Sequence, residues 1–261
     1  MMRSDVRTRI WHVNDRVTER TDCVAKEVEV CLRFLRGGQI ERVSVHCLPV
    51  FLRELAVGFL ICEGFRSSVE NVRILAAAED AADIRNACER YEVIVELSET
   101  VSDVAVTDDA KHSVRRKRVT CERVICEIPT LVRMLDECGT TFKKTGCTHV
   151  VGVFECCGDK HVIVEDVSRH CAIDKAVGLC IEKGISTYES VLVTSCRQTY
   201  STMRKAANAG FPAVVSVSAP TSAAIKIAEI SGITLVGFAR ERRFNVYANA
   251  WKLLRHGAGA I

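Results

Sequence analysis

The segment from Asp166 to Lys175 concentrates groups that can do chemistry. Its ten residues carry six ionisable or thiol side chains, namely Asp166, Arg169, His170, Cys171, Asp174 and Lys175. Such a density at the start of a helix favours a ligand-binding site, because helix N-termini offer free N–H groups and the positive end of the helix dipole. The alternative is a helix capped by Asp166 or Ser168 whose charges face solvent.

Two further segments place hydroxyls and amides directly after apolar runs. They are Thr194-Ser195-Cys196-Arg197 and Ser218-Ala219-Pro220-Thr221-Ser222. Both suit anionic groups, and Ser218 and Thr221 are the candidate contacts. The second segment is also a good helix-capping sequence with proline in the first turn, so a purely structural role stays open.

The run from Phe238 to Arg243 brings three arginines together. It reads Phe238-Ala239-Arg240-Glu241-Arg242-Arg243 and follows an apolar strand. The planar fork of arginine binds phosphate in a bidentate way, so the run indicates a phosphate- or pyrophosphate-bearing ligand such as a nucleotide. The alternative is a charged hairpin tip in solvent.

A polar turn precedes these segments in the chain. Thr145-Gly146-Cys147-Thr148-His149 follows Lys143-Lys144. His149 is either a functional group or an ordinary histidine with its hydrogen bonds satisfied.

The elements that must position these groups follow one another regularly beyond Pro129. We expect a helix to Cys138, strands at 161–165, 191–194, 213–217 and 233–238, and helices that end near 183, 207 and 230. Strands that alternate with helices predict an α/β fold with a parallel or mixed sheet covered by helices. Ligands of such sheets bind beyond the carboxyl ends of the strands, where the polar segments lie.

The first half of the chain has a different character. Partial alternation at 27–34 and 40–45 around Gly37-Gly38 predicts a β-hairpin, and apolar residues at helical spacing predict a helix at 50–63. Strands near 71–76 and 91–97 flank an alanine-rich, helical segment. We therefore expect a polar segment at 1–24, a small β-rich lobe at 25–120 that ends in a mobile loop at 98–120, and an α/β cofactor-binding domain at 121–261.

Composition excludes several classes of protein. The N-terminus lacks the apolar core of a signal peptide, and Arg53 and Glu54 interrupt the most apolar stretch, 48–62. Fourteen scattered cysteines indicate a reducing compartment, here the cytoplasm. The sequence contains no Cys-x-x-Cys pair, so we expect no structural zinc. We expect no bound metal, no membrane and, at a net charge of +3, no nucleic-acid partner.

Four longer motifs together resemble the formate dehydrogenase accessory sulfurtransferase family, FdhD/NarQ. They are Glu54-Leu-Ala-Val-Gly-Phe-Leu-Ile-Cys-Glu63-Gly64, Glu165-Asp166-Val-Ser-Arg169-His170-Cys-Ala-Ile-Asp174-Lys175, Ser216-Val-Ser218-Ala-Pro220-Thr221-Ser222 and Leu235-Val-Gly-Phe-Ala-Arg240. The resemblance runs from about residue 25 to 250, and the order and spacing of the motifs make it specific.

The resemblance implies a cytidine-deaminase-like fold with three layers, in a homodimer. It implies a sulfur carrier that takes sulfur from a cysteine desulfurase and passes it to a molybdenum (or tungsten) bis-pterin guanine dinucleotide cofactor. Formate dehydrogenase or a related oxidoreductase then receives the cofactor. A GDP-like ligand is expected at residues 238–243, with Asp166, Arg169, His170 and Asp174 in the same pocket.

The family carries sulfur as a persulfide on the first cysteine of a Cys-Gly-x-Cys loop. The matching region here runs from Thr120 to Cys126, so Cys121 is the first candidate and Cys126 the second, in a loop that extends over 98–126. This chain departs from the pattern, since four residues separate the two cysteines and the loop glycine is absent. Arg118 and Arg123 beside Cys121 favour its thiolate.

Other departures from the family pattern leave two alternatives. Cys147, Ser168, Cys171 and Cys196 stand where family members have other residues, several of them glycine. A zinc hydrolase with this fold would need His-x-Glu and Pro-Cys-x-x-Cys, and the sequence contains neither. A non-catalytic chaperone for the pterin cofactor, without persulfide chemistry, stays open.

Overall fold

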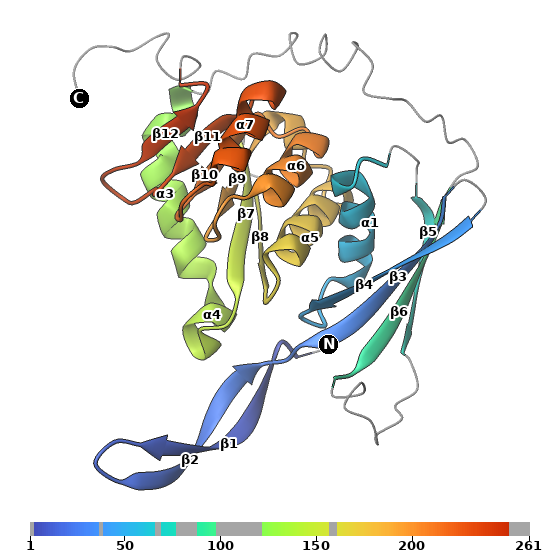
Figure 1. Cartoon of the computed structure of the whole chain (residues 1–261), viewed down its shortest axis with the longest axis vertical. Helices are drawn as coiled ribbons and strands as arrows, with labels where there is room; N and C mark the ends of the chain where they lie inside the picture. The colour runs from blue at the N-terminus through green and yellow to red at the C-terminus, as the bar shows by residue number, and fades with distance from the viewer. Residues whose placement is uncertain are drawn as a thin grey trace.

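The computed structural model describes residues 3–36, 39–65, 69–76, 88–97, 122–156 and 161–250. Three sheets lie in this part of the chain, with two, four and six strands. Figure 1 shows the six-stranded sheet among helices, the four-stranded sheet beside it and the two-stranded sheet extending away from both.

The six-stranded sheet is mixed. Its strands are β7 (His149–Glu155), β8 (His161–Asp166), β9 (Ser190–Thr194), β10 (Ala213–Ser216), β11 (Thr234–Gly237) and β12 (Asn245–Ala248), in the order β12-β11-β10-β9-β7-β8. β9, β10 and β11 are parallel, while β7 is antiparallel to both β8 and β9. The carboxyl ends of β8 to β11 therefore meet at one edge, which we call the strand-end edge.

Helices cover both faces of this sheet, as predicted for an α/β protein. α5 (Arg169–Glu182), α6 (Tyr200–Asn208) and α7 (Ser222–Ser231) lie on one face, and α3 (Glu122–Cys138) lies on the other (Figure 1). Each face has its own core, with Val153 and Leu192 in one and Val191 and Val215 in the other. Short α4 (Thr140–Thr145) and the 3-10 helix η2 (Thr187–Glu189) complete this half. The cytidine-deaminase-like arrangement stays a prediction.

The four-stranded sheet forms a β-rich lobe in the first half of the chain. It contains β3 (Val28–Arg36), β4 (Gln39–Cys47), β5 (Val69–Ala76) and β6 (Arg90–Leu97), in the order β4-β3-β6-β5. The predicted hairpin is confirmed as antiparallel β3 and β4. The predicted helix is confirmed as α1 (Leu52–Cys62), whose Leu55 and Phe59 share a core with Leu32 and Phe34 of β3.

α1 and α5 touch backbone to backbone, and this contact joins the two halves of the molecule. A Cβ placed on Gly58 of α1 would lie 1.7 Å from the carbonyl oxygen of Asp174, and one on Gly178 of α5 would lie 2.0 Å from the carbonyl oxygen of Glu54. Only glycine allows this approach, so the two residues fix how the β-rich lobe sits on the main sheet.

The structure adds strands that were not predicted and corrects one helix boundary. In the segment expected only to be polar, β1 (Asp5–Val13) and β2 (Val17–Ala25) pair along their whole length. The polar turn before His149 leads into strand β7, which the sequence interpretation missed. α3 begins at Glu122 rather than at Pro129, so residues 122–126 are helical and not part of a mobile loop.

Two other expectations lie outside the described residues. They are the helical character of the alanine-rich segment after β5 and the mobility of 98–120. Within the described residues, no helix is long and apolar enough to cross a membrane.

Candidate functional site

The strand-end edge is held together by hydrogen bonds between the segments that leave β9, β10 and β11. Val217 N donates to Thr194 O at 2.9 Å, and Phe238 N donates to Ser218 O at 3.1 Å. Gln198 also pairs with the loop after β10, donating from its N to Ala219 O at 3.1 Å. The three predicted polar segments therefore form one fixed surface.

The arginines after β11 divide into two roles. Arg240 donates from Nη1 to the carbonyl oxygens of Val217 (2.6 Å) and Ala239 (2.8 Å), so it ties the exits of β10 and β11 together. Arg242 and Arg243, like Glu241, are exposed. Neither arginine makes an ion pair within the described part of the chain, which leaves both guanidinium groups available to an anion.

Phe238 has an unusual backbone for a bulky residue. Its φ is 51°, in the left-handed region, and its side chain is 42% exposed. Its ring lies 6.5 Å from the ring of Tyr247. Strain of this kind persists only where the surroundings impose it, and here it presents an aromatic face at the edge.

Arg169 and Arg197 bring further positive charge to the same edge, near His149. Burial lowers the pKa of His149 from its ordinary value, and the nearby charges of Arg169 and Arg197 lower it further. The Nε of Arg169 is buried and has no hydrogen-bond partner among the described residues. An unpaired buried donor next to other cations indicates space for an acceptor such as a phosphate oxygen.

Asp166 has a different role from the one predicted. Its side chain is fully buried and forms an ion pair with Lys175, with Nζ 2.6 Å from Oδ2. It also accepts from Leu48 N at 3.1 Å and Ser168 N at 2.8 Å. Because chain donors take up both oxygens, the expectation that Asp166 faces a ligand is wrong: it anchors the end of β8 to the turn before α1.

The capping roles fall to the hydroxyl residues. Ser168 is the N-cap of α5 and accepts from Cys171 N, and Thr221 is the N-cap of α7 and accepts from Ala224 N at 3.2 Å. Both keep a hydroxyl proton that can be donated elsewhere. Ser218 is half-buried, and its N donates to Ser216 Oγ at 3.0 Å, so its backbone belongs to the fixed loop.

A cleft of about 480 Å³ lies on the other side of the α5 N-terminus and contains His170 and Asp174. Its wall is formed by β4, α1, α5 and α6, with residues Glu27, Ser44, Val45, His46, Phe59, Glu63, Val167, Ser168, His170, Cys171, Asp174, Ser201, Arg204 and Lys205. The predicted site residues therefore lie in two different places. His170 and Asp174 line the cleft, while Arg169 borders the strand-end edge.

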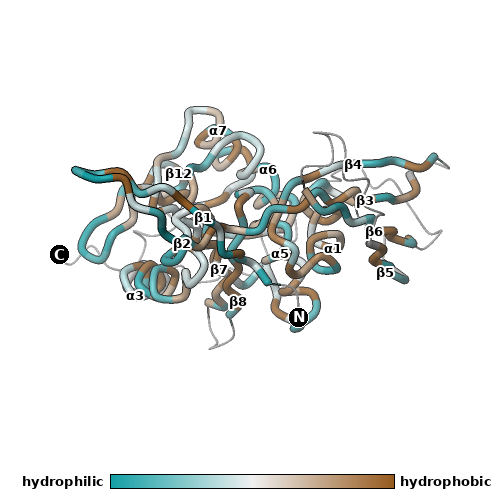
Figure 2. Tube along the Cα trace, turned by 90° about the horizontal axis from the view of Figure 1, so that it is seen from below, coloured by the Kyte–Doolittle hydropathy of each residue, from teal (hydrophilic) through white to brown (hydrophobic). Residues whose placement is uncertain are grey.

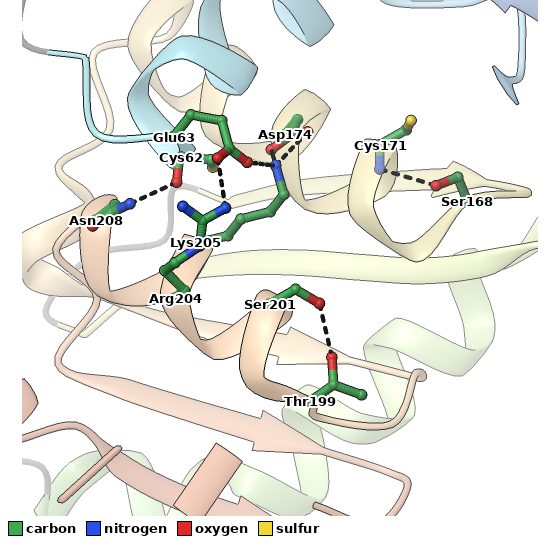
Figure 3. A network of polar contacts seen from close by, with 10 residues as sticks. All are labelled: Cys62, Glu63, Ser168, Cys171, Asp174, Thr199, Ser201, Arg204, Lys205 and Asn208. Carbon is green, nitrogen blue, oxygen red and sulfur yellow. Dashed lines mark hydrogen bonds and ion pairs between the residues drawn. The ribbon is translucent and has the colours of Figure 1, made fainter. Parts of the chain in front are cut away.

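Lys205 is the centre of a charged network in this cleft (Figure 3). Its Nζ lies 2.9 Å from Oδ1 of Asp174 and 3.0 Å from Oε1 of Glu63, and Arg204 contacts the second oxygen of Glu63 at 2.5 Å. Burial lowers the pKa of Lys205, but the carboxylates of Asp174 and Glu63 outweigh burial, so the pKa lies above its ordinary value. Burial, with Arg169 and Lys205, lowers the pKa of His170 to about 4. His170 is therefore neutral at neutral pH and can accept a hydrogen bond.

Glu63, Arg204 and Lys205 were not predicted as a group. Glu63 lies in one of the motifs that resemble the family, but no local pattern connects it to residues about 140 positions later. Among the described residues, no cluster of three or more His, Cys, Asp or Glu side chains could hold a metal ion.

Only one of the two candidate sulfur carriers can be placed. Cys121 is outside the described residues, and the backbone of Cys126 is part of α3. Of the extra cysteines, Cys147 is exposed while Cys171 and Cys196 are buried. A hydrogen bond with Cys47, together with burial, raises the pKa of the Cys171 thiol, and burial raises that of Cys196. Both are therefore poor nucleophiles.

Comparison with known proteins identifies the family. The sequence model of the FdhD/NarQ family matches residues 25–254. The chain belongs to the FdhD/NarQ family. It is 33% identical to the sulfur carrier protein FdhD of Thermoplasma acidophilum, over 90% of this chain and 88% of that protein. It is 28% identical to the sulfur carrier protein FdhD of Methanothermobacter thermautotrophicus, over 94% and 96% of the two chains.

A solved structure shares the FdhD/NarQ fold. It is described as a formate dehydrogenase accessory protein from Desulfotalea psychrophila, and it superimposes with a TM-score of 0.68 over 97% of this chain and 100% of that one. The sequence identity is 24%, so this similarity concerns the fold. The resemblance inferred from the sequence motifs is confirmed.

Proposed function

We propose that this protein is a sulfur carrier that binds a molybdenum or tungsten bis-pterin guanine dinucleotide cofactor as its substrate. The observation that carries the proposal is the strand-end edge, where Arg169 follows β8, Arg197 follows β9, and Arg242 and Arg243 follow β11. Such an edge suits a pyrophosphate. Relatives that carry the name sulfur carrier protein supply the reaction class.

In this proposal, different residues of the edge bind different parts of the dinucleotide. Arg242 and Arg243 bind phosphate oxygens, and the unpaired Nε of Arg169 donates to another acceptor of the ligand. The exposed ring of Phe238 offers a face on which a flat base can stack. Arg240 holds the loops after β10 and β11 in place through its hydrogen bonds to the carbonyl oxygens of Val217 and Ala239, and it does not bind the phosphate.

Cys121 carries the sulfur in this proposal. Its thiolate attacks the outer sulfur of a persulfide on a cysteine desulfurase, so a Cys121 persulfide forms and the desulfurase keeps a thiolate. Cys126 can then attack the Cys121 sulfur, which releases one sulfide to the cofactor and leaves a disulfide. Arg118 and Arg123 flank Cys121 in the sequence, and positive charges near a thiol favour its thiolate.

The proposed partners follow from this cycle. A cysteine desulfurase donates the sulfur, and formate dehydrogenase or a related molybdenum or tungsten enzyme receives the cofactor. We place the protein in the cytoplasm as a homodimer.

Sulfur transfer is tested by incubating the protein with a cysteine desulfurase and cysteine and measuring its intact mass. We expect a gain of one reducible sulfur atom, lost in Cys121→Ala and kept in the control Cys147→Ala, which removes an exposed thiol. Cys126→Ala should keep the persulfide and slow its release. Full activation of the recipient enzyme by Cys121→Ala would favour a cofactor chaperone without persulfide chemistry.

Nucleotide binding is tested separately by calorimetry with GDP. Arg242→Ala and Arg243→Ala together should weaken binding by at least about tenfold, since each removed phosphate contact contributes about 1 kcal/mol or more. The matched control, Arg7→Ala with Arg9→Ala, removes the same charge from β1 and should leave affinity unchanged. Equal affinities for the two double variants would exclude this edge as the nucleotide site.

A further inference from the structure

Residues 5–25 form an arm that projects from the body of the protein (Figure 1). β1 and β2 pair only with each other among the described strands, and the arm meets the body at its base, where Ser4 Oγ lies 3.4 Å from Thr141 Oγ1. An isolated two-stranded ribbon is marginally stable in water, and its outer edges carry unpaired backbone groups. Within the described residues, the outer edges of the arm are therefore free to pair with another strand.

The arm exposes apolar side chains that its own pairing does not cover. Trp11, Val13 and Val17 are 65%, 68% and 64% exposed, and Figure 2 shows a hydrophobic band just behind the polar tip. Such an exposed apolar end is unusual on a free two-stranded ribbon and is typical of an interaction surface.

The two faces of the arm differ. Asp5 and Cys23 share one face and are partly buried at the base, where Lys144 of α4 lies 3.9 Å from Asp5. Because successive side chains of a strand alternate, Arg20 and Asp22 lie on the opposite face, away from α4. Both are exposed, and neither makes an ion pair within the described residues.

The charge order of β2 is self-complementary. When two copies of a strand pair antiparallel about a two-fold axis perpendicular to the sheet, paired residues share a face, so the axis passes through a residue. When the axis passes through Thr21, Arg20 of one copy lies opposite Asp22 of the other. The two-fold symmetry places Asp22 of the first copy opposite Arg20 of the second. Centred one residue to either side, it sets Arg20 or Asp22 against its own copy. Like charges directly opposite are unfavourable, so the charges favour the register centred on Thr21 over the two neighbouring ones.

We propose that β2 pairs antiparallel with β2 of a second copy of this chain, centred on Thr21, and that the two arms form one four-stranded sheet. The edge of β2 opposite β1 supplies the backbone groups, and two Arg20–Asp22 pairs fix the register. The interface lies on the arm, apart from the strand-end edge, and does not depend on sulfur transfer.

The test uses single charge reversals in the full chain and sedimentation at micromolar concentration. Arg20→Asp and Asp22→Arg each turn two attractive pairs into two repulsive ones, so each should weaken self-association by about tenfold or more. An equimolar mixture of the two variants should associate again, because the introduced aspartate faces the introduced arginine. The control Arg16→Asp makes the same charge change in the turn at the tip and should associate like the parent.

The mixture distinguishes loss of the interface from loss of folding, since a misfolded arm would not be rescued. A monomeric parent protein would overturn the proposal. So would a parent-like association of Arg20→Asp alone, or a mixture that stays monomeric while both variants keep native circular dichroism. This inference rests on the homodimer of the proposed function. Failure of persulfide transfer or GDP binding leaves these results unchanged, so the interface is tested apart from the sulfur chemistry.

Discussion

Replacing Gly58 with alanine tests the contact between α1 and α5. In an isolated helix this change stabilises by about 1 kcal/mol, because alanine is the better helix former. Here the new Cβ would lie 1.7 Å from the carbonyl oxygen of Asp174, while real Cβ atoms essentially never come closer than 3.0 Å. The two helices must therefore separate by more than about 1 Å.

That separation is expensive because both neighbours of the new methyl group are backbone. Overpacking of a core costs about 1–3 kcal/mol when side chains can adjust, and here no rotamer change relieves the clash. We therefore expect Gly58→Ala to lower the free energy of unfolding by about 3 kcal/mol or more. Gly178→Ala should act in the same direction, since its Cβ would meet Glu54 at 2.0 Å.

Urea unfolding at fixed protein concentration provides the measurement, with Gly184→Ala as the control. Gly184 has a φ of +64° and no atom within 4 Å of an added Cβ, so alanine there meets only the left-handed backbone penalty of about 1–2 kcal/mol. A parent-like or raised midpoint for Gly58→Ala, at an unchanged slope, would refute the close contact of the two helices.

Three further predictions concern ionisable side chains of α5 and α6. Lys205→Met leaves the Asp174 carboxylate buried without its partner and should destabilise the fold by about 3–5 kcal/mol in thermal unfolding. Lys175→Met should cost a similar amount. Combining it with Asp166→Asn should recover most of the loss; no recovery in the double variant would argue against the ion pair. The third concerns His170, whose pKa falls to about 4 from 6.5 on folding. Its stabilising contribution is present above pH 6.5 and is lost as the pH falls towards about 4, so His170→Gln should flatten the decline in stability across this range.

The strands and helices that carry the site were predictable because each has a strong local pattern. β8, β9, β10 and β11 are short apolar runs that end in polar, cap-forming residues, and these signals gave both the fold class and the strand-end edge. β7 was missed because it follows directly on the turn at Gly146 and is buried on both faces, so it shows no alternation. β1 and β2 were missed for the opposite reason, since both of their faces are exposed.

The roles of individual charged residues were harder to predict. Asp166 and Arg169 stand three positions apart in one charged segment. Asp166 is buried in an ion pair with Lys175, whereas Arg169 borders the strand-end edge. Sequence alone cannot separate them, because the partner of Asp166, Lys175, belongs to the same charged segment and the turn at Leu48 is far away in the chain. Lys205 was missed since its two carboxylates come from α5 and from the end of α1.

The glycine contact between α1 and α5 also bears on how the molecule can move. Since Lys205 further links Asp174 to Glu63 at the end of α1, the β-rich lobe and the main sheet are joined by backbone contact and by charge. Hinge motion between them would break both at once, so the cleft between them has a fixed width. Under the proposed function, the donor and the recipient of the sulfur are therefore distinguished by their fit to a rigid surface, and not by a cleft that opens for one and closes around the other.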